Sequence, residues 1–220
     1  ACIDVENRSV KLLNRREIWF QERYPELKDI WKNVTAKKVI LDGEIVVMEN
    51  GKPNFYLLEE REHIDNKIRI EILSKIHPAT YIVFDILYKD GNDLTSLPLS
   101  ERRKILEECI KEGNNLVISE IVEEEGIEFF EKVKEMGLEG IMAKKKDSPY
   151  LIGKRSRYWL KIKALKTIDA IICGYTKGEG KREPYFGALL LGIYDGGKLR
   201  NIGRVGTGNW SEKRLKEIKE

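Results

Sequence analysis

Acidic side chains stand where they could hold a divalent cation beside a phosphate. Glu44 lies in LDGEIVV and Glu139 lies in GLEGIMAK, each next to a glycine that lets the backbone approach a ligand closely. Carboxylates fixed on strand ends are the hard oxygen ligands that Mg²⁺ takes beside a triphosphate. An isolated Asp-Gly-Glu is also a common hairpin turn, so this motif taken alone favours a structural role.

Two lysines alternate in the segment WLKIK, residues 159–163. In a strand, Lys161 and Lys163 project from one face, and Leu160 and Ile162 are expected to be buried on the other. Two ammonium groups on one strand face suit a phosphate. An amphipathic edge strand is the more common structural alternative.

Charge is segregated along the chain, although the net charge is only +3. Residues 101–140 carry twelve glutamates against six lysines and arginines, whereas residues 144–163 carry eight basic residues against Asp147 alone. A basic stretch that includes Tyr150, Tyr158 and Trp159 is typical of a surface that contacts phosphate or nucleic acid. A solvated basic face is the alternative interpretation.

The composition indicates a globular protein with a charged surface, since 41% of the residues are hydrophobic and 35% are charged. No apolar run approaches the roughly 20 residues of a membrane span, and no signal-peptide pattern opens the chain. We therefore expect a cytoplasmic protein without a membrane partner. Cys2, Cys109 and Cys173 lack Cys-x-x-Cys spacing, so we interpret all three as small buried hydrophobic residues.

Strands and helices that could position these side chains are readable from hydrophobic periodicity. We expect a strand or a hairpin remnant at 1–13, and strands at 39–48, broken at Asp42-Gly43, and at 81–88. The helical segments are expected at 17–34, interrupted by Pro25, at 99–113, with Ser100 as cap and Gly113 as end, and at 129–137. From about residue 168, short strands separated by glycine turns suggest a small β-barrel of the OB kind.

Four motifs follow one another along the chain: LDGEIVV, VFDILYKDG, LEGIMAKKKDSPY and RYWLKIK. In this order and spacing the sequence resembles the ATP-dependent DNA ligases of the covalent nucleotidyltransferase superfamily. The segment FGALLLGIYDGGKLRNIGRVGTG is similar to the OB domain of compact bacterial and archaeal ligases, including end-joining types. The resemblance implies an α+β fold: an ATP-grasp-like nucleotidyltransferase domain of antiparallel sheets with flanking helices, followed by an OB-fold β-barrel. We place these domains at 1–163 and 169–220, with 164–168 as linker.

The resemblance also implies a nucleotide site. Phe84, in the F-D-x-L motif, is expected to stack on one face of adenine, and Met142 is expected to cover the other. Glu44 and Glu139 are the implied metal-site carboxylates. ATP and Mg²⁺ are the implied cofactors, and AMP is the implied covalent intermediate.

Basic residues are implied to contact the phosphates of this site. Lys161 and Lys163 are expected to neutralise the α-phosphate, with Lys144 nearby. Arg15, in LNRRE where many relatives have Ser-Arg, is expected to contact a phosphate of the nucleotide or of the nick. Fixed cations of this kind stabilise the charge that develops in phosphoryl transfer.

The nucleophilic lysine that the family carries in K-x-D-G-x-R has no counterpart in the chain. Asp42, Asp90 and Asp195 each precede a glycine, but Ile40, Tyr88 and Ile193 stand two positions before them. We expect the lysine motif to precede Ala1 and the closing motif of the OB domain to follow Glu220. The chain alone is therefore predicted not to form a covalent adenylate.

The function implied is a ligase core that seals nicks in double-stranded DNA as a monomer, by enzyme adenylation, AMP transfer to the 5′-phosphate and phosphodiester formation. An RNA ligase or RNA-capping enzyme shares the same stacking residues and phosphate lysines, although EGIMAK together with GRVGTG favours a DNA ligase. A non-catalytic nucleic-acid or nucleotide-binding module is the third possibility, because the lysine nucleophile is not in the chain.

Overall fold

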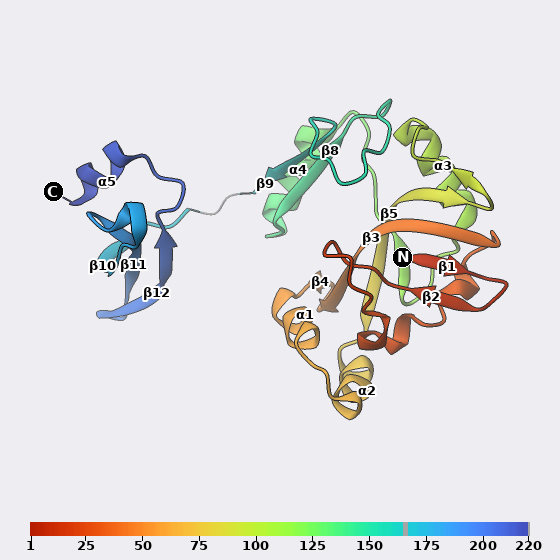
Figure 1. The fold of residues 1–220 in the computed structure, drawn as a ribbon, viewed down its shortest axis with the longest axis horizontal. Coiled ribbons are helices and arrows are strands. Elements are labelled where there is room, and N and C mark those ends of the chain that lie inside the picture. Colours follow the sequence, from red (N-terminus) through yellow and green to blue (C-terminus); the bar gives the residue numbers. More distant parts are fainter. Residues whose placement is uncertain (165–166, 220) are drawn as a thin grey trace. The chain divides into compact units, whose positions relative to one another are not determined.

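The computed structural model describes residues 1–164 and 167–219. Its contacts divide the chain into two units, Ala1–Ala164 and Leu165–Glu220 (Figure 1). Residues 165–166 of the expected linker lie outside the described residues.

A seven-stranded sheet forms the centre of the first unit, with the strand order β2-β1-β3-β5-β6. Strand β4 pairs with β3, and β7 is parallel to β5, while the other pairs are antiparallel. Buried aliphatic side chains of β3 and β5 pack with those of the surrounding turns and helix α3 to form the main core. The strands are β1 (Cys2–Asp4), β2 (Ser9–Lys11), β3 (Lys38–Glu49), β4 (Lys52–Pro53), β5 (Ala79–Lys89), β6 (Asn92–Asp93) and β7 (Leu116–Ile118).

The expected break at Asp42-Gly43 is wrong, because β3 runs through it as one strand. The register with β5 shifts between Asp42 and Gly43, which marks a bulge rather than a turn. A Cβ at Gly43 would lie 2.5 Å from the carbonyl oxygen of Ile82 and 2.7 Å from the ring of Tyr81. Glycine is thus required here by the close approach of β5.

The helices of the first unit differ from those that the sequence predicts. The expected helical region at 17–34 consists of three 3₁₀ turns, η1 (Gln21–Arg23), η2 (Pro25–Leu27) and η3 (Ile30–Asn33). Pro25 opens η2, where its fixed φ and missing N–H are tolerated. The α-helices of this unit are α1 (Phe55–Glu62), α2 (Lys67–Ile76), α3 (Leu99–Cys109) and α4 (Gly126–Glu135).

Helix α3 begins at Leu99 as expected, but its cap and its end differ from the prediction. Pro98 precedes its first turn, so Ser100 lies inside the helix and is not the cap. The helix ends at Cys109, before Gly113, because Ile110 leaves it in extended conformation and forms a β-bridge with Val34. A tertiary pairing therefore ends the helix before its glycine signal.

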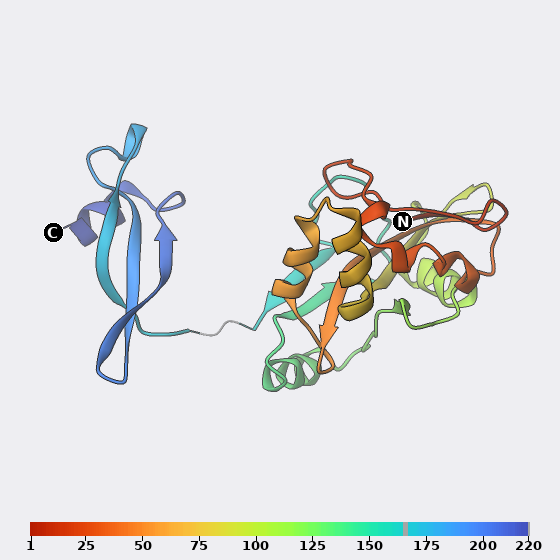
Figure 2. The ribbon, with the colours of Figure 1, turned by 90° about the horizontal axis from the view of Figure 1, so that it is seen from below.

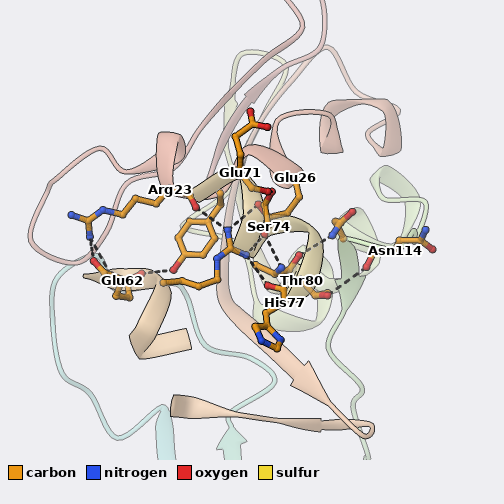
Figure 3. A network of polar contacts seen from close by, with 12 residues as sticks. Arg23, Glu26, Glu62, Glu71, Ser74, His77, Thr80 and Asn114 are labelled. Atoms are coloured by element: carbon orange, nitrogen blue, oxygen red, sulfur yellow. Dashed lines mark hydrogen bonds and ion pairs between the residues drawn. The ribbon is translucent and has the colours of Figure 1, made fainter. Parts of the chain in front are cut away.

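A buried polar network joins the turns to helix α1 and strand β5 (Figure 3). Arg61 is 2% exposed and pairs with the Glu26 carboxylate. Its guanidinium also donates to the backbone oxygens of Arg23 and His77, both at 2.9 Å, while Glu26 accepts the Ala79 N–H at 2.8 Å. Helices α1 and α2 lie side by side (Figure 2). The network fixes them at one end of the sheet, since a buried charge pair tolerates little displacement.

A separate two-stranded hairpin, β8 (Gly140–Lys144) and β9 (Trp159–Lys163), completes the first unit. Helix α4 packs against β8 (Figure 1). The loop between the two strands returns to the segment that joins β6 to α3. There the Leu99 N–H donates to the Ser148 oxygen at 3.0 Å and the Tyr150 N–H donates to the Thr95 oxygen at 2.8 Å. The hairpin and the sheet are thereby joined by the loop as well as by the chain.

The second unit is an antiparallel sheet of order β10-β11-β12 covered by one helix. Phe186, Leu189 and Leu215 are buried between the sheet and the helix. The described residues 167–219 form an open sheet and not a closed barrel, so the OB barrel stays a prediction. The elements are β10 (Ile171–Lys177), the turn η4 (Gly180–Arg182), β11 (Phe186–Asp195), β12 (Lys198–Gly206) and α5 (Glu212–Lys219).

The α+β class with antiparallel sheets and flanking helices is confirmed. The interpretation of the three cysteines holds only for Cys109, which is buried; Cys2 is partly exposed and Cys173 is exposed. Cys173 lies on β10, an edge strand of an open sheet, and most side chains of that strand are exposed for the same reason.

Candidate active site

A cleft of about 1050 Å³ lies in the first unit. It is bordered by β3, by the end of the β1–β2 hairpin, and by the hairpin β8–β9 with its loop. Its walls include residues 12–15, 42–45, 149–156 and Trp159. Three of the predicted motifs thus contribute to one concave surface, which is the form that small-molecule sites take.

Three predicted site residues line this cleft: Arg15, Glu44 and Met142. Glu44 follows the bulge in β3 and is exposed. Arg15 stands in a turn that Asn14 organises, since the Asn14 side chain accepts the N–H groups of Arg16 at 2.9 Å and of Ile18 at 3.1 Å. An Asx-type turn therefore presents Arg15 at the cleft.

The hairpin register decides which motif residues share a face. Met142 pairs with Lys161, Lys144 pairs with Trp159, and Gly140 pairs with Lys163. Residues directly opposite each other in an antiparallel pair project to the same side, so both predicted phosphate lysines share a face with Met142 and Lys144. Neither lysine is among the residues that line the cleft.

The other face of this hairpin is not buried as expected. Leu160 is 53% exposed and Ile162 is 41% exposed. The prediction was wrong because the sheet has only two strands and α4 packs mainly against β8, which leaves β9 uncovered. Alternation correctly predicted which residues of β9 share a face, but it could not predict what packs against each face.

Phe84 and Lys144 meet behind the cleft wall. The Lys144 Nζ lies 4.2 Å from the centroid of the Phe84 ring and 4.0 Å from that of Trp159, and the two rings are in edge-to-face contact at 5.8 Å. Burial lowers the pKa of Lys144 to about 8. The expected stacking residue and the expected phosphate lysine are thus in contact with each other.

The predicted metal carboxylates lie in different surroundings. Glu139 accepts a hydrogen bond from the Lys161 ammonium at 3.1 Å, and its side chain is 83% exposed. Within residues 1–164 and 167–219 no three His, Cys, Asp or Glu side chains form a cluster that could hold a metal ion. Mg²⁺ bound to a nucleotide commonly takes one or two carboxylates together with phosphate oxygens and waters, a requirement that Glu44 at the cleft can meet.

Several residues that support the site were not assigned to it from the sequence. The Tyr150 hydroxyl donates to Asp42 at 2.6 Å across the cleft wall. Asp85 and Arg102 form a bidentate ion pair, with both distances 2.8 Å and both side chains fully buried, and Arg102 also donates to the Ser148 oxygen at 3.0 Å. These contacts hold the 145–158 loop on the sheet. The sequence identifies Tyr150 only as one of the aromatic residues of the basic segment.

Comparison with known proteins assigns the family. Residues 1–163 match the family model described as ATP dependent DNA ligase domain. The chain belongs to this family. It is 33% identical over 232 residues to a probable DNA ligase of Dictyoglomus turgidum, which covers 98% of the chain and 40% of that protein. It is 35% identical to the multifunctional non-homologous end joining protein LigD of Mycolicibacterium smegmatis, covering 100% of the chain and 27% of that protein. The chain therefore spans less than half the length of these two curated relatives.

Solved structures agree with this assignment. The ligase domain of LigD from M. tuberculosis has a TM-score of 0.60 and 31% identity, covering 99% of the chain and 67% of that domain. A mycobacterial DNA ligase D complexed with ATP and MES has a TM-score of 0.61 and 30% identity, covering 96% of the chain and 64% of its own. The family resemblance inferred from the four motifs is confirmed.

Proposed function

We propose that this chain is the core of an ATP-dependent DNA ligase that seals nicks in double-stranded DNA. One observation carries the proposal: residues from separate ligase motifs, Arg15, Glu44 and Met142, line a single cleft in the unit that matches the ligase domain. The family match favours this function over an RNA ligase, a capping enzyme or a non-catalytic module.

The roles of the cleft residues follow from their chemistry. Glu44 would supply an oxygen ligand to Mg²⁺, and the ion would neutralise negative charge on the phosphates. Arg15 offers a planar cation to a phosphate of the nucleotide or the nick. Met142 gives an apolar surface for adenine, with a soft side chain that adapts to its shape.

Lys161 and Lys163 are proposed to reach the α-phosphate from the shared face of the hairpin. In the structure Lys161 is paired with Glu139, both with more than half of the side chain exposed. Exposed pairs contribute little stability, so separating the Glu139 carboxylate from the Lys161 ammonium when substrate binds would cost little. The pair would thus keep Glu139, the proposed metal ligand, beside Lys161, the proposed phosphate ligand.

The basic segment 144–163 is proposed to contact the phosphates of nicked duplex DNA. No helix among the described residues is long and apolar enough to cross a membrane. The cytoplasmic location, the monomeric state and the domain limits at 163 and 169 stay predictions.

Sealing of a nick that already carries 5′-AMP tests the proposal, because this last step needs no enzyme nucleophile. We expect Mg²⁺-dependent sealing of such DNA, and loss of sealing in Glu44→Gln and Glu139→Gln. Glu131→Gln, which removes an exposed ion pair with Lys134 on α4, is the matched control. Sealing that neither active-site substitution changes would show that the metal site lies elsewhere. With labelled ATP the chain alone is expected to form no covalent adenylate.

A further inference from the structure

An aromatic site beside the cleft is filled by a cation of the protein itself. Phe84 of β5 and Trp159 of β9 meet edge to face, with an angle of 79° between their planes. The Lys144 Nζ lies over both rings, at 4.2 Å and 4.0 Å from their centroids. Tyr150 supports Trp159 from a second direction, at 5.7 Å between centroids. The three rings come from β5, β9 and the loop that precedes β9.

Trp159 is the member of the Phe84–Trp159 pair that reaches the cleft. It lines the cleft together with Met142, whereas Phe84 is not among the lining residues. Met142 and Trp159 also project from the same face of the hairpin, since they are diagonal neighbours across β8 and β9. A flat ligand that rests on Met142 is therefore adjacent to the indole.

Lys144 is held by these rings and not by a carboxylate. In the described part of the chain it forms no ion pair within 4.0 Å, although Asp85 and Asp42 are near enough to favour its charge. Burial and the neighbouring guanidinium groups of Arg103 and Arg102 act against that charge. A partly buried ammonium whose contacts are π-faces can be displaced by another group that stacks on the same faces.

We propose that Phe84 and Trp159 together form the base site of the nucleotide. In the free protein the Lys144 ammonium occupies this site, and it is displaced when the base binds. The inference rests on the proposed function and assigns Trp159 a base contact that the motifs give only to Phe84 and Met142. Every nucleobase has a π-face that can stack on either ring. Once displaced, Lys144 lies on the same hairpin face as Lys161 and Lys163, where it can meet a phosphate.

Adenosine is the probe that isolates the base, because it carries no phosphate for Lys144 to attract. We expect Lys144→Met to bind adenosine about 2- to 10-fold more tightly than the wild type, as removal of a cation–π contact removes the competitor. Calorimetric titration gives the affinities. Lys134→Met, which removes an exposed ammonium on α4, should leave adenosine binding unchanged. Unchanged or weaker adenosine binding by Lys144→Met would refute the proposed displacement of Lys144 by the base.

Substitution of the indole tests the contact itself. We expect Trp159→Leu to weaken adenosine and ATP binding roughly 5- to 100-fold, and Trp159→Phe to restore most of the affinity, because stacking needs a ring rather than an indole. A thermal melt of each variant separates lost stacking from lost folding, and Trp159→Phe keeps the test valid if Trp159→Leu does not fold.

The outcomes separate the inference from the function on which it rests. Normal ATP binding by Trp159→Leu and Trp159→Phe alike would refute the base contact and leave the ligase proposal intact. A wild-type protein that binds neither ATP nor adenosine, even with Mg²⁺, would refute both.

Discussion

At the scale of single residues, the position of Lys144 has a consequence for stability. Burial lowers the pKa of Lys144 from 10.5 to about 8 in the folded chain. Between these two values the unfolded chain binds more protons at this group than the folded chain does, so the contribution of Lys144 to the free energy of unfolding rises with pH. Below pH 8 both states are charged and the full cost of burying the charge is present.

We therefore predict that Lys144→Met removes a contribution to the free energy of unfolding that varies with pH. Urea unfolding of both proteins at several pH values from 7 to 10 measures it. The gain in unfolding free energy of the variant over the wild type should be largest near pH 7 and shrink as the pH rises. A difference that does not vary with pH would contradict the lowered pKa of Lys144.

At the scale of elements, the Asp85–Arg102 pair joins β5, α3 and the 145–158 loop. Removing one partner of a buried pair leaves an uncompensated charge, so Arg102→Met should destabilise the first unit by about 3–5 kcal/mol. Arg69→Met removes an exposed pair with Glu60 and should cost less than about 1 kcal/mol. Denaturant unfolding compares them. Equal effects would mean that the buried pair does not hold the elements together.

The bulge in β3 makes a second prediction at this scale. Gly43→Ala places a methyl group 2.5 Å from the Ile82 oxygen, which is backbone and cannot move aside cheaply. We expect a loss of about 1–3 kcal/mol in the free energy of unfolding, as for other overpacked sites. Gly126→Ala, at the start of α4 with no atom within 4 Å of the new methyl group, is the control and should be neutral or stabilising. The same thermal or urea melts measure both variants.

At the scale of the whole molecule, we predict that the separation of charge governs the proposed binding to DNA. Phosphate contacts by residues 144–163 would release counterions, so affinity for nicked duplex should fall steeply between about 50 and 200 mM salt, with little sequence preference. Lys154→Gln and Arg155→Gln, which change residues of the cleft wall, should each lower the slope of log affinity against log salt by about 1. Lys132→Gln on α4 should leave the slope unchanged. A fluorescence-anisotropy titration that finds an affinity independent of salt would refute this prediction.

The family and most of the strands could be predicted from the residues alone. The motifs identify the family because each pairs a functional residue with a local backbone preference. Examples are the aromatic residue in the β-branched strand at 81–88 and the carboxylate beside a glycine at 43–44. Hydrophobic periodicity likewise predicted a strand or a hairpin remnant at 1–13, since side chains of a strand alternate whatever they later pack against.

Three features depend on tertiary contacts: the end of α3, the exposure of Leu160 and Ile162, and the position of Lys144. Helix α3 ends where Ile110 pairs with Val34, 76 positions earlier in the chain, which no capping signal near Gly113 can indicate. Leu160 and Ile162 are exposed because their hairpin has two strands and one helix mainly against β8. Lys144 meets Phe84 because the loop and the hairpin register bring two distant segments together. In each case the structure depends on which segment packs against the residue, and that segment is distant in the sequence.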